Sequence, residues 1–336
     1  MTCLDGYAHG TGDHCGSTSL RNLADHFGWG FDEPTCFGLA AGLGFTHFEL
    51  AESPERGFFG RALWIEDAFF EHLGIGYELH RGDDWETVVD RLRERTAAGE
   101  PVLVYTDIYH LPYFGTDTHF APHTLLVVGI EDDVAVLSDS EFDELQRLPL
   151  AQLREAMEST AVFALECRHL VVTDPEPAVG VETAIETAIV DVASYMLEPD
   201  SRERPLGPAA HGLAGIRRFA EELPAYVDFA DPQWSVRFAY QNVERRGTGG
   251  GTFRRLYARF LDRTTEQLSE LDPDLADRMH EIADDWTAIG DTLKDASEVD
   301  EVSEMEPLLA EAQSAIYDVA DREQELYDEL LTVVET

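Results

Sequence analysis

The first 175 residues alternate between two patterns of apolar and polar positions. Apolar residues three and four positions apart indicate helices, and short runs of β-branched and aromatic residues indicate strands. These patterns predict helices over residues 17–27, 64–73, 85–98 and 149–157, strands over 101–107, 123–128, 134–139 and 161–172, and a glycine-rich loop over 37–45. The mixture predicts an α+β region.

The pattern changes after a Pro/Gly-rich linker, Thr173–Gly180. Beyond the linker only helical spacing remains. It predicts helices over residues 181–197, 212–223, 252–268, 273–293 and 305–334. We therefore expect two domains, an α+β domain over residues 1–175 and an all-helical domain over residues 176–336.

Charge narrows the possible partners. The 336 residues include 24 basic and 67 acidic side chains, which gives a formal net charge of −43. Such a charge repels nucleic acids and anionic membrane surfaces, so neither is an expected partner. Lys294 is the only lysine, and an acidic, lysine-poor surface is typical of halophilic proteins that work in molar salt. We expect the acidic helices near the carboxyl end to form a solvated face or a homo-oligomer surface.

Other features of the sequence predict a cytoplasmic protein. No apolar run approaches the length that spans a bilayer, and the amino terminus lacks the pattern of a secretory signal. The four cysteines are Cys3, Cys15, Cys36 and Cys167, and none of them forms a Cys-x-x-Cys pair. Four cysteines in a chain of this length predict individual thiols rather than a disulfide framework.

Cys15 is the first candidate for chemistry because it directly precedes the helix predicted from residue 17. Unpaired N–H groups and the helix dipole favour a thiolate at that end. A thiolate is the form that attacks a carbonyl carbon. The alternative is a small buried cysteine without a chemical role.

A later β-hairpin supplies possible partners for Cys15. With a turn centred on Glu131, His123 lies directly opposite Asp139, which suits a carboxylate that orients an imidazole. A register slip or a bulge would break this pairing. In the alternative interpretation, His123 and Asp139 end their strands without meeting Cys15.

The same residues carry a resemblance to a known family. Segment His14–Leu23, segment Phe37–Phe45, the run Pro122-His123-Thr124 and Asp139 resemble the butirosin biosynthesis acyltransferase family, whose amino-terminal domain is similar to papain-like cysteine peptidases. Val243–Tyr257 resembles the hallmark of that family's carboxy-terminal domain. The resemblance covers nearly the whole chain and implies a papain-like first domain.

The resemblance also implies roles for individual residues. Cys15 is the expected nucleophile, His123 the general base and acid, and Asp139 the orienting carboxylate. Papain-like enzymes generally carry an oxyanion-hole Gln six residues before the nucleophile, and this chain has His9 there. His9, His14 and the backbone N–H of Cys15 are the candidate oxyanion donors.

The expected reaction is acyl transfer from a thioester to a small-molecule amine through an acyl-cysteine. The resemblance implies a pantetheine thioester, on an acyl carrier protein or coenzyme A, as the donor substrate, and no bound cofactor. Two alternatives stay open: a cysteine peptidase or amidohydrolase that uses water as the acceptor, and a catalytically silent binding protein on the same fold.

Two further features have weaker interpretations. Gly249, Gly250 and Gly251 precede Arg254 and Arg255, so this loop either grips an anionic part of the donor or simply connects helices. His119 and His123 are four residues apart on a predicted strand, about 13 Å from each other, so no metal site is expected there.

Overall fold

The chain forms two units, and each is discontinuous in sequence. A computed structural model describes residues 4, 6–199, 209–265, 267–268 and 271–334. The first unit contains Met1–Cys36 and Leu73–Ala178, and the second contains Phe37–His72 and Val179–Thr336. Cys3 lies outside the described residues.

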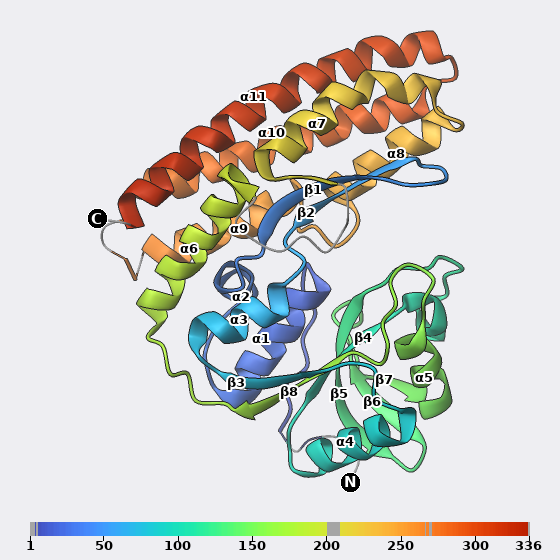
Figure 1. The fold of residues 1–336 in the computed structure, drawn as a ribbon, viewed down its shortest axis with the longest axis vertical. Helices are drawn as coiled ribbons and strands as arrows, with labels where there is room; N and C mark the ends of the chain where they lie inside the picture. Colours follow the sequence, from blue (N-terminus) through green and yellow to red (C-terminus); the bar gives the residue numbers. More distant parts are fainter. Residues whose placement is uncertain (1–3, 5, 200–208, 266, 269–270, 335–336) are drawn as a thin grey trace. The chain divides into compact units, whose positions relative to one another are not determined.

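An antiparallel six-stranded sheet of order β3-β8-β4-β5-β6-β7 forms the centre of the first unit. The elements of the first unit are α1 (Cys15–Phe27), β3 (Gly76–His80), α4 (Trp85–Ala97), β4 (Val102–Thr106), the 3-10 helices η1 (Ile108–His110) and η2 (Pro112–Phe114), β5 (His123–Glu131), β6 (Val134–Ser138), β7 (Gln146–Pro149), α5 (Leu150–Glu158) and β8 (His169–Asp174). Alternate apolar residues of β4, β5 and β6 share one core with α4 and α5. Both helices flank the sheet in Figure 1.

The second unit contains a small sheet and most of the helices. It consists of β1 (Leu43–Glu49), β2 (Arg56–Arg61), α3 (Ile65–Leu73), α6 (Val181–Leu197), β9 (Ala209–His211), α7 (Gly212–Glu222), the 3-10 helix η4 (Leu223–Asp228), α8 (Pro232–Glu244), α9 (Arg254–Thr265), α10 (Pro273–Glu298) and α11 (Val302–Val334). Helix α2 (Glu33–Leu39) passes from the first unit into the second. The long helices α10 and α11 lie side by side (Figure 1).

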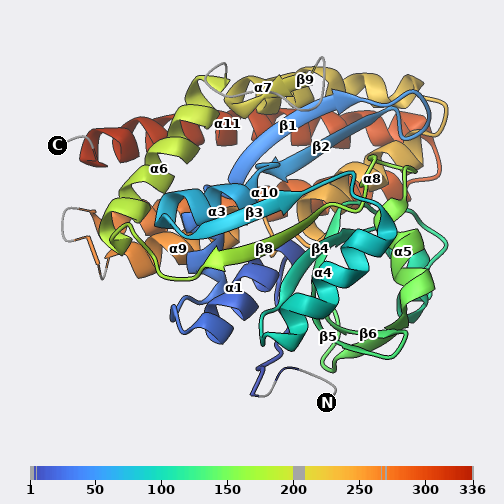
Figure 2. The same cartoon turned by 60° about the horizontal axis from the view of Figure 1, so that its bottom comes forward.

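The small sheet has the order β2-β1-β9, with all neighbours antiparallel. Figure 2 shows the β1–β2 hairpin running alongside α7. The pairing of Thr46 with His211 joins two segments that are far apart in sequence. This pairing explains why residues 37–72 belong to the second unit.

The α+β class with a helical carboxy-terminal region is confirmed, but the predicted domains need correction in two respects. The break after residue 178 lies close to the predicted one, whereas residues 37–72 do not belong to the first unit. The region after residue 175 is also not entirely helical, because β9 completes the small sheet. Long-range strand pairing caused both errors.

Two predicted elements were wrong in their extent. The segment predicted as a loop over residues 37–45 contains the end of α2 and the start of β1, and both Phe37 and Phe45 are fully buried. The strand predicted from residue 161 begins only at His169. Glu166 and Cys167 before it have positive φ angles, which belong to a turn.

No helix in the described part of the chain is both long enough and apolar enough to cross a membrane.

Candidate active site

Cys15 is the first residue of α1, as its position in the sequence suggested. The helix begins there because His14 is its N-cap: His14 Nδ1 accepts a hydrogen bond from the Ser17 N–H at 3.2 Å. The helix ends at Gly28, whose φ of 76° is the left-handed conformation that glycine adopts easily. Cys15 is 8% exposed, so its thiol lies at a buried helix start.

A carboxylate that sequence reasoning missed supports this helix start. Glu33 accepts hydrogen bonds from the N–H groups of Asp13 and His14 at 3.0 Å and from the hydroxyls of Ser17 and Thr18 at 2.9 Å. Negative charge is favourable at a helix amino terminus. Nothing in the sequence distinguishes Glu33 from the other acidic residues, because its role depends on the approach of a second helix.

Two backbone donors remain open beside the thiol. In the described chain, the N–H groups of Cys15 and Gly16 have no hydrogen-bond acceptor within the protein. Both belong to the first turn of α1, where such groups have no partner inside the helix. They are therefore available to a negatively charged oxygen next to Cys15.

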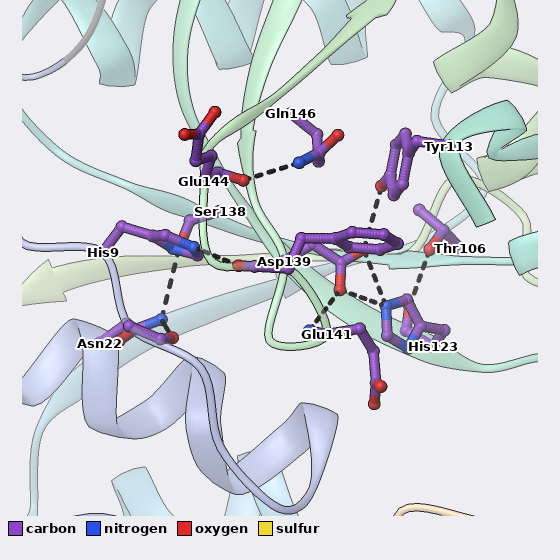
Figure 3. Close-up of polar contacts among 12 residues, drawn as sticks. His9, Asn22, Thr106, Tyr113, His123, Ser138, Asp139, Glu141, Glu144 and Gln146 are labelled. Carbon is purple, nitrogen blue, oxygen red and sulfur yellow. Dashed lines mark hydrogen bonds and ion pairs between the residues drawn. The ribbon is translucent and has the colours of Figure 1, made fainter.

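His123 and Asp139 form a buried pair (Figure 3). His123 Nε2 lies 3.1 Å from both carboxylate oxygens of Asp139, which is fully buried. Asp139 also accepts hydrogen bonds from the Tyr113 hydroxyl at 3.0 Å and from the Glu141 N–H at 3.3 Å. The Thr106 hydroxyl donates to the His123 carbonyl at 3.0 Å. The imidazole is therefore fixed through its ring and its backbone.

The predicted register that brought His123 to Asp139 was wrong, although the two side chains do meet. The turn consists of Asp132 and Asp133 between the paired residues Glu131 and Val134, and the register shifts between Val127 and Gly129. Asp139 follows the last residue of β6 rather than standing opposite His123. The carboxylate reaches the imidazole from the turn after the strand.

Cys15 completes the group, which we call the cysteine cluster: Cys15, His14, His123 and Asp139. The thiol interacts with the imidazoles of both His123 and His14. Burial opposes the thiolate, but attraction to His14 and the hydrogen bonds from the two imidazoles outweigh it and hold the pKa of Cys15 well below its ordinary value. Burial also opposes a charged imidazole, but Asp139 raises the pKa of His123 well above its ordinary value. The two opposite shifts favour a thiolate–imidazolium pair.

The two histidines expected as oxyanion donors have other roles. His9 Nε2 donates to the Phe142 carbonyl at 2.7 Å, and its Nδ1 contacts the Ser138 hydroxyl at 2.8 Å (Figure 3). His14 uses Nδ1 as the N-cap acceptor, and its imidazole also interacts with the Cys15 thiol. Both ring nitrogens of His9 are engaged within the protein, so His9 is corrected from an oxyanion donor to a structural residue. For His14 the oxyanion role stays a prediction, beside the backbone N–H groups of Cys15 and Gly16.

Two N–H groups of the glycine-rich loop are engaged within the protein. Gly249, Gly250 and Gly251 have positive φ angles, as a tight loop requires. The Gly251 N–H donates to the Glu244 carboxylate at 2.9 Å, and the Gly250 N–H donates to the Thr248 hydroxyl at 3.2 Å. The loop therefore already holds a carboxylate of its own chain.

The two arginines after the loop are also engaged within the second unit. Arg254 is fully buried and forms two hydrogen bonds of 2.9 Å with Glu323. Arg255 pairs with Asp284 at 2.9 Å. The substrate-binding role considered for Arg254 is corrected to a structural one, whereas that for Arg255, whose side chain is 36% exposed, stays a prediction.

Comparisons with known proteins find two family models along the chain, and their bounds differ from those of the two structural units. Residues 151–330 match the family model described as a domain of unknown function, DUF4872, and residues 14–140 match the model described as butirosin biosynthesis protein H, N-terminal. No curated protein matches the chain.

A solved structure from Bacillus anthracis, named as a C39-like peptidase, is 12% identical, and the alignment covers 52% of this chain and 97% of that one. Its TM-score of 0.37 is too low to bear on fold or activity. The DUF4872 match alone spans more than half of the 336 residues, and the butirosin match contains Cys15, His123 and Asp139. The chain therefore belongs to the DUF4872 family, with an amino-terminal region of the butirosin biosynthesis protein H type.

Proposed function

We propose that this protein is a cysteine-dependent acyltransferase that moves an acyl group from a pantetheine thioester to an amine. The observation that carries the proposal is the contact of the Cys15 thiol with an imidazole that Asp139 fixes. In this mechanism the Cys15 thiolate attacks the thioester carbonyl, and the N–H groups of Cys15 and Gly16 stabilise the oxyanion. The thiol of the donor leaves with the proton of His123, and an acyl-cysteine remains.

The second half of the reaction releases the acyl group. His123, now neutral, accepts a proton from the incoming amine as the amine attacks the acyl-cysteine carbonyl. The amide forms, the carbon–sulfur bond breaks, and the thiolate of Cys15 is restored. Because Asp139 holds Nε2, the Nδ1 atom of His123 is the one left for these transfers.

Two observations favour an amine over water as the acceptor. Residues 14–140 match a family that is named for a biosynthetic protein. The Glu141 side chain extends beside His123 (Figure 3), and it interacts electrostatically with Cys15, His14 and His123. An exposed carboxylate at this place attracts an amine substrate that carries its positive charge on a second group, which leaves the attacking amine neutral.

The test uses a short acyl thioester of N-acetylcysteamine, a minimal mimic of pantetheine, with the full chain in molar KCl. Peptide mass spectrometry should find the acyl group on Cys15, and Cys15→Ala should abolish this label. Amines should then remove the label faster than water does, and Glu141→Gln should slow removal by a cationic amine more than by a neutral one.

Two outcomes oppose the proposal. Discharge by water as fast as by any amine would identify a hydrolase. A Cys15 that accepts no acyl group and also reacts with iodoacetamide no faster than an ordinary thiol would favour a binding protein.

A further inference from the structure

Three potential metal ligands converge outside the cysteine cluster. One ligand atom each from Asp107, His110 and His119 lies within 4.8 Å of the other two. Asp107 and His110 lie at the start of the connection between β4 and β5, and His119 lies near its end. We call this set the loop histidine cluster. His119, four residues before His123 in the sequence, contacts Asp107 in the structure.

Small shifts of the side chains are needed before the cluster surrounds a tetrahedral ion. His119 Nδ1 lies 2.7 Å from Asp107 Oδ2, and the two imidazole centroids are 6.1 Å apart. Two imidazoles on one zinc ion, with Zn–N distances of about 2.0 Å, have centroids about 5 Å apart. His119 is 39% exposed and His110 is half-buried, so modest side-chain rotations bring both nitrogens to the ion.

A second carboxylate lies within reach. Glu155 on α5 has a carboxylate oxygen 3.8 Å from His110 Nδ1, and its side chain is 66% exposed. It is therefore free to rotate toward an ion bound by His110. Two imidazoles and two carboxylates form a ligand set typical of zinc and related divalent transition metals.

A second histidine cluster in the first unit is not suited to bind a metal ion. His80, Asp83 and His169 are also close together. However, the Arg91 guanidinium donates to Asp83 at 2.7 Å and to His169 Nε2 at 2.8 Å. A cationic side chain already occupies the place of a cation there.

No such competitor contacts the loop histidine cluster. Within the described residues, no arginine or lysine side chain contacts Asp107, His110 or His119. Asp107 is also oriented by hydrogen bonds from the Ser159 hydroxyl at 2.7 Å and the Phe120 N–H at 3.1 Å. Outer contacts of this kind fix a ligand before a metal binds.

We propose that Asp107, His110 and His119 bind a divalent transition metal of the zinc class, with Glu155 as the fourth ligand. His119 binds through Nδ1, which only requires its proton to move to Nε2 by exchange with water. The site is separate from the proposed acyl transfer and uses none of its residues.

The ion would link η1, the end of the β4–β5 connection and α5. That connection also carries Tyr113, which donates to Asp139, and Phe114, whose ring packs edge-on against His123 at 5.4 Å. Metal binding therefore makes the frame around His123 more rigid. Its role is structural, because the cluster does not contact Cys15 or His123.

The test is a Co²⁺ titration of the full chain followed by visible absorption. Molar KCl and excess Mg²⁺ saturate the acidic surface, and Cys15→Ser removes the thiol of the cysteine cluster as a competing ligand. We expect one equivalent of tightly bound Co²⁺ without a thiolate charge-transfer band. His119→Ala should weaken binding by about 100-fold or more, since even loss of an outer-shell partner weakens a metal site about 10- to 100-fold. Zn²⁺ should displace the Co²⁺.

His80→Ala is the matched control, because it removes a histidine from the other cluster and should leave the affinity unchanged. His110→Gln is a second test of the site if His119→Ala unfolds, which circular dichroism without metal would show. The proposal is overturned if wild type binds no Co²⁺ under these conditions, or if the tight equivalent persists in both histidine variants.

Discussion

The cysteine cluster of the first unit and the arginine cluster of the second (Arg254, Glu323, Trp286 and Tyr327) are both buried, but the protein satisfies their polar atoms to different extents. Arg254 donates to both oxygens of Glu323 and to three backbone carbonyls. Glu323 also accepts hydrogen bonds from Trp286 at 2.8 Å and Tyr327 at 3.0 Å. This network leaves nothing for a ligand.

In and beside the cysteine cluster, only some of the polar groups have hydrogen-bond partners within the protein. Asp139 has its partners, whereas in the described chain the N–H groups of Cys15 and Gly16 have no acceptor within the protein. The pKa values of Cys15 and His123 move in opposite directions, toward the charged forms. Perturbed pKa values also occur in structural ion pairs. The difference that points to chemistry is therefore the set of donors left open beside a charged nucleophile.

The largest expected effect comes from breaking the arginine cluster. Arg254→Met leaves Glu323 buried without its cation, and removal of one partner of a buried ion pair costs about 3–5 kcal/mol. The free energy of unfolding, measured with urea in molar KCl, should fall by that amount. Arg254→Met combined with Glu323→Leu should recover part of the loss because no unpaired charge remains. A loss below about 1 kcal/mol in the single variant would contradict a structural role.

A smaller effect, on reactivity rather than stability, is expected in the cysteine cluster. Because the pKa of Cys15 is lowered, its alkylation by iodoacetamide should already be fast at pH 6. Loss of the imidazole in His123→Ala should raise that pKa toward the ordinary value of about 8.5 and slow the reaction at pH 6 by about 100-fold. Peptide mass spectrometry gives the rate for each cysteine.

Two other cysteines serve as internal references for this experiment. Burial raises the pKa of Cys36 well above its ordinary value and that of Cys167 to about 11. Both should react slowly at pH 6 in wild type and in His123→Ala. Equal rates for Cys15 in the two proteins would show that His123 does not activate the thiol.

The smallest effect is expected at Glu33, which supports the helix start without touching the thiol. Glu33→Gln weakens charged hydrogen bonds to Asp13, His14, Ser17 and Thr18. The free energy of unfolding should fall by about 1.5 kcal/mol. Alkylation of Cys15 at pH 6 should not slow, because loss of a nearby negative charge favours the thiolate. A large drop in that rate would mean that Glu33 positions Cys15 for reaction.

The parts of the fold that the sequence predicted are local ones. Helix α1 and the β5–β6 hairpin can be predicted from apolar spacing within a few residues. These two elements identified Cys15, His123 and Asp139 as candidate site residues. The register of the hairpin was predicted wrongly because a two-residue turn and a bulge both depend on pairing that apolar spacing does not show.

Features that depend on distant segments could not be predicted. Glu33 becomes a support for α1 only after α2 has packed beside it, and Arg254 becomes a structural residue only because Glu323 lies 69 positions later in the chain. A buried arginine next to a glycine-rich loop looks the same in a sequence as an anion-binding arginine. The distinction requires knowledge of where its hydrogen bonds go.

The division of residues 37–72 from their sequence neighbours has a consequence for synthesis on the ribosome. Strand β1 is made early, but its partner β9 emerges only about 165 residues later. At about 5–20 residues per second, the edge of β1 waits roughly 8 to 33 seconds for its partner. An unpaired strand edge is a site for association with other chains. The negative charge of the nascent chain opposes such association during that interval.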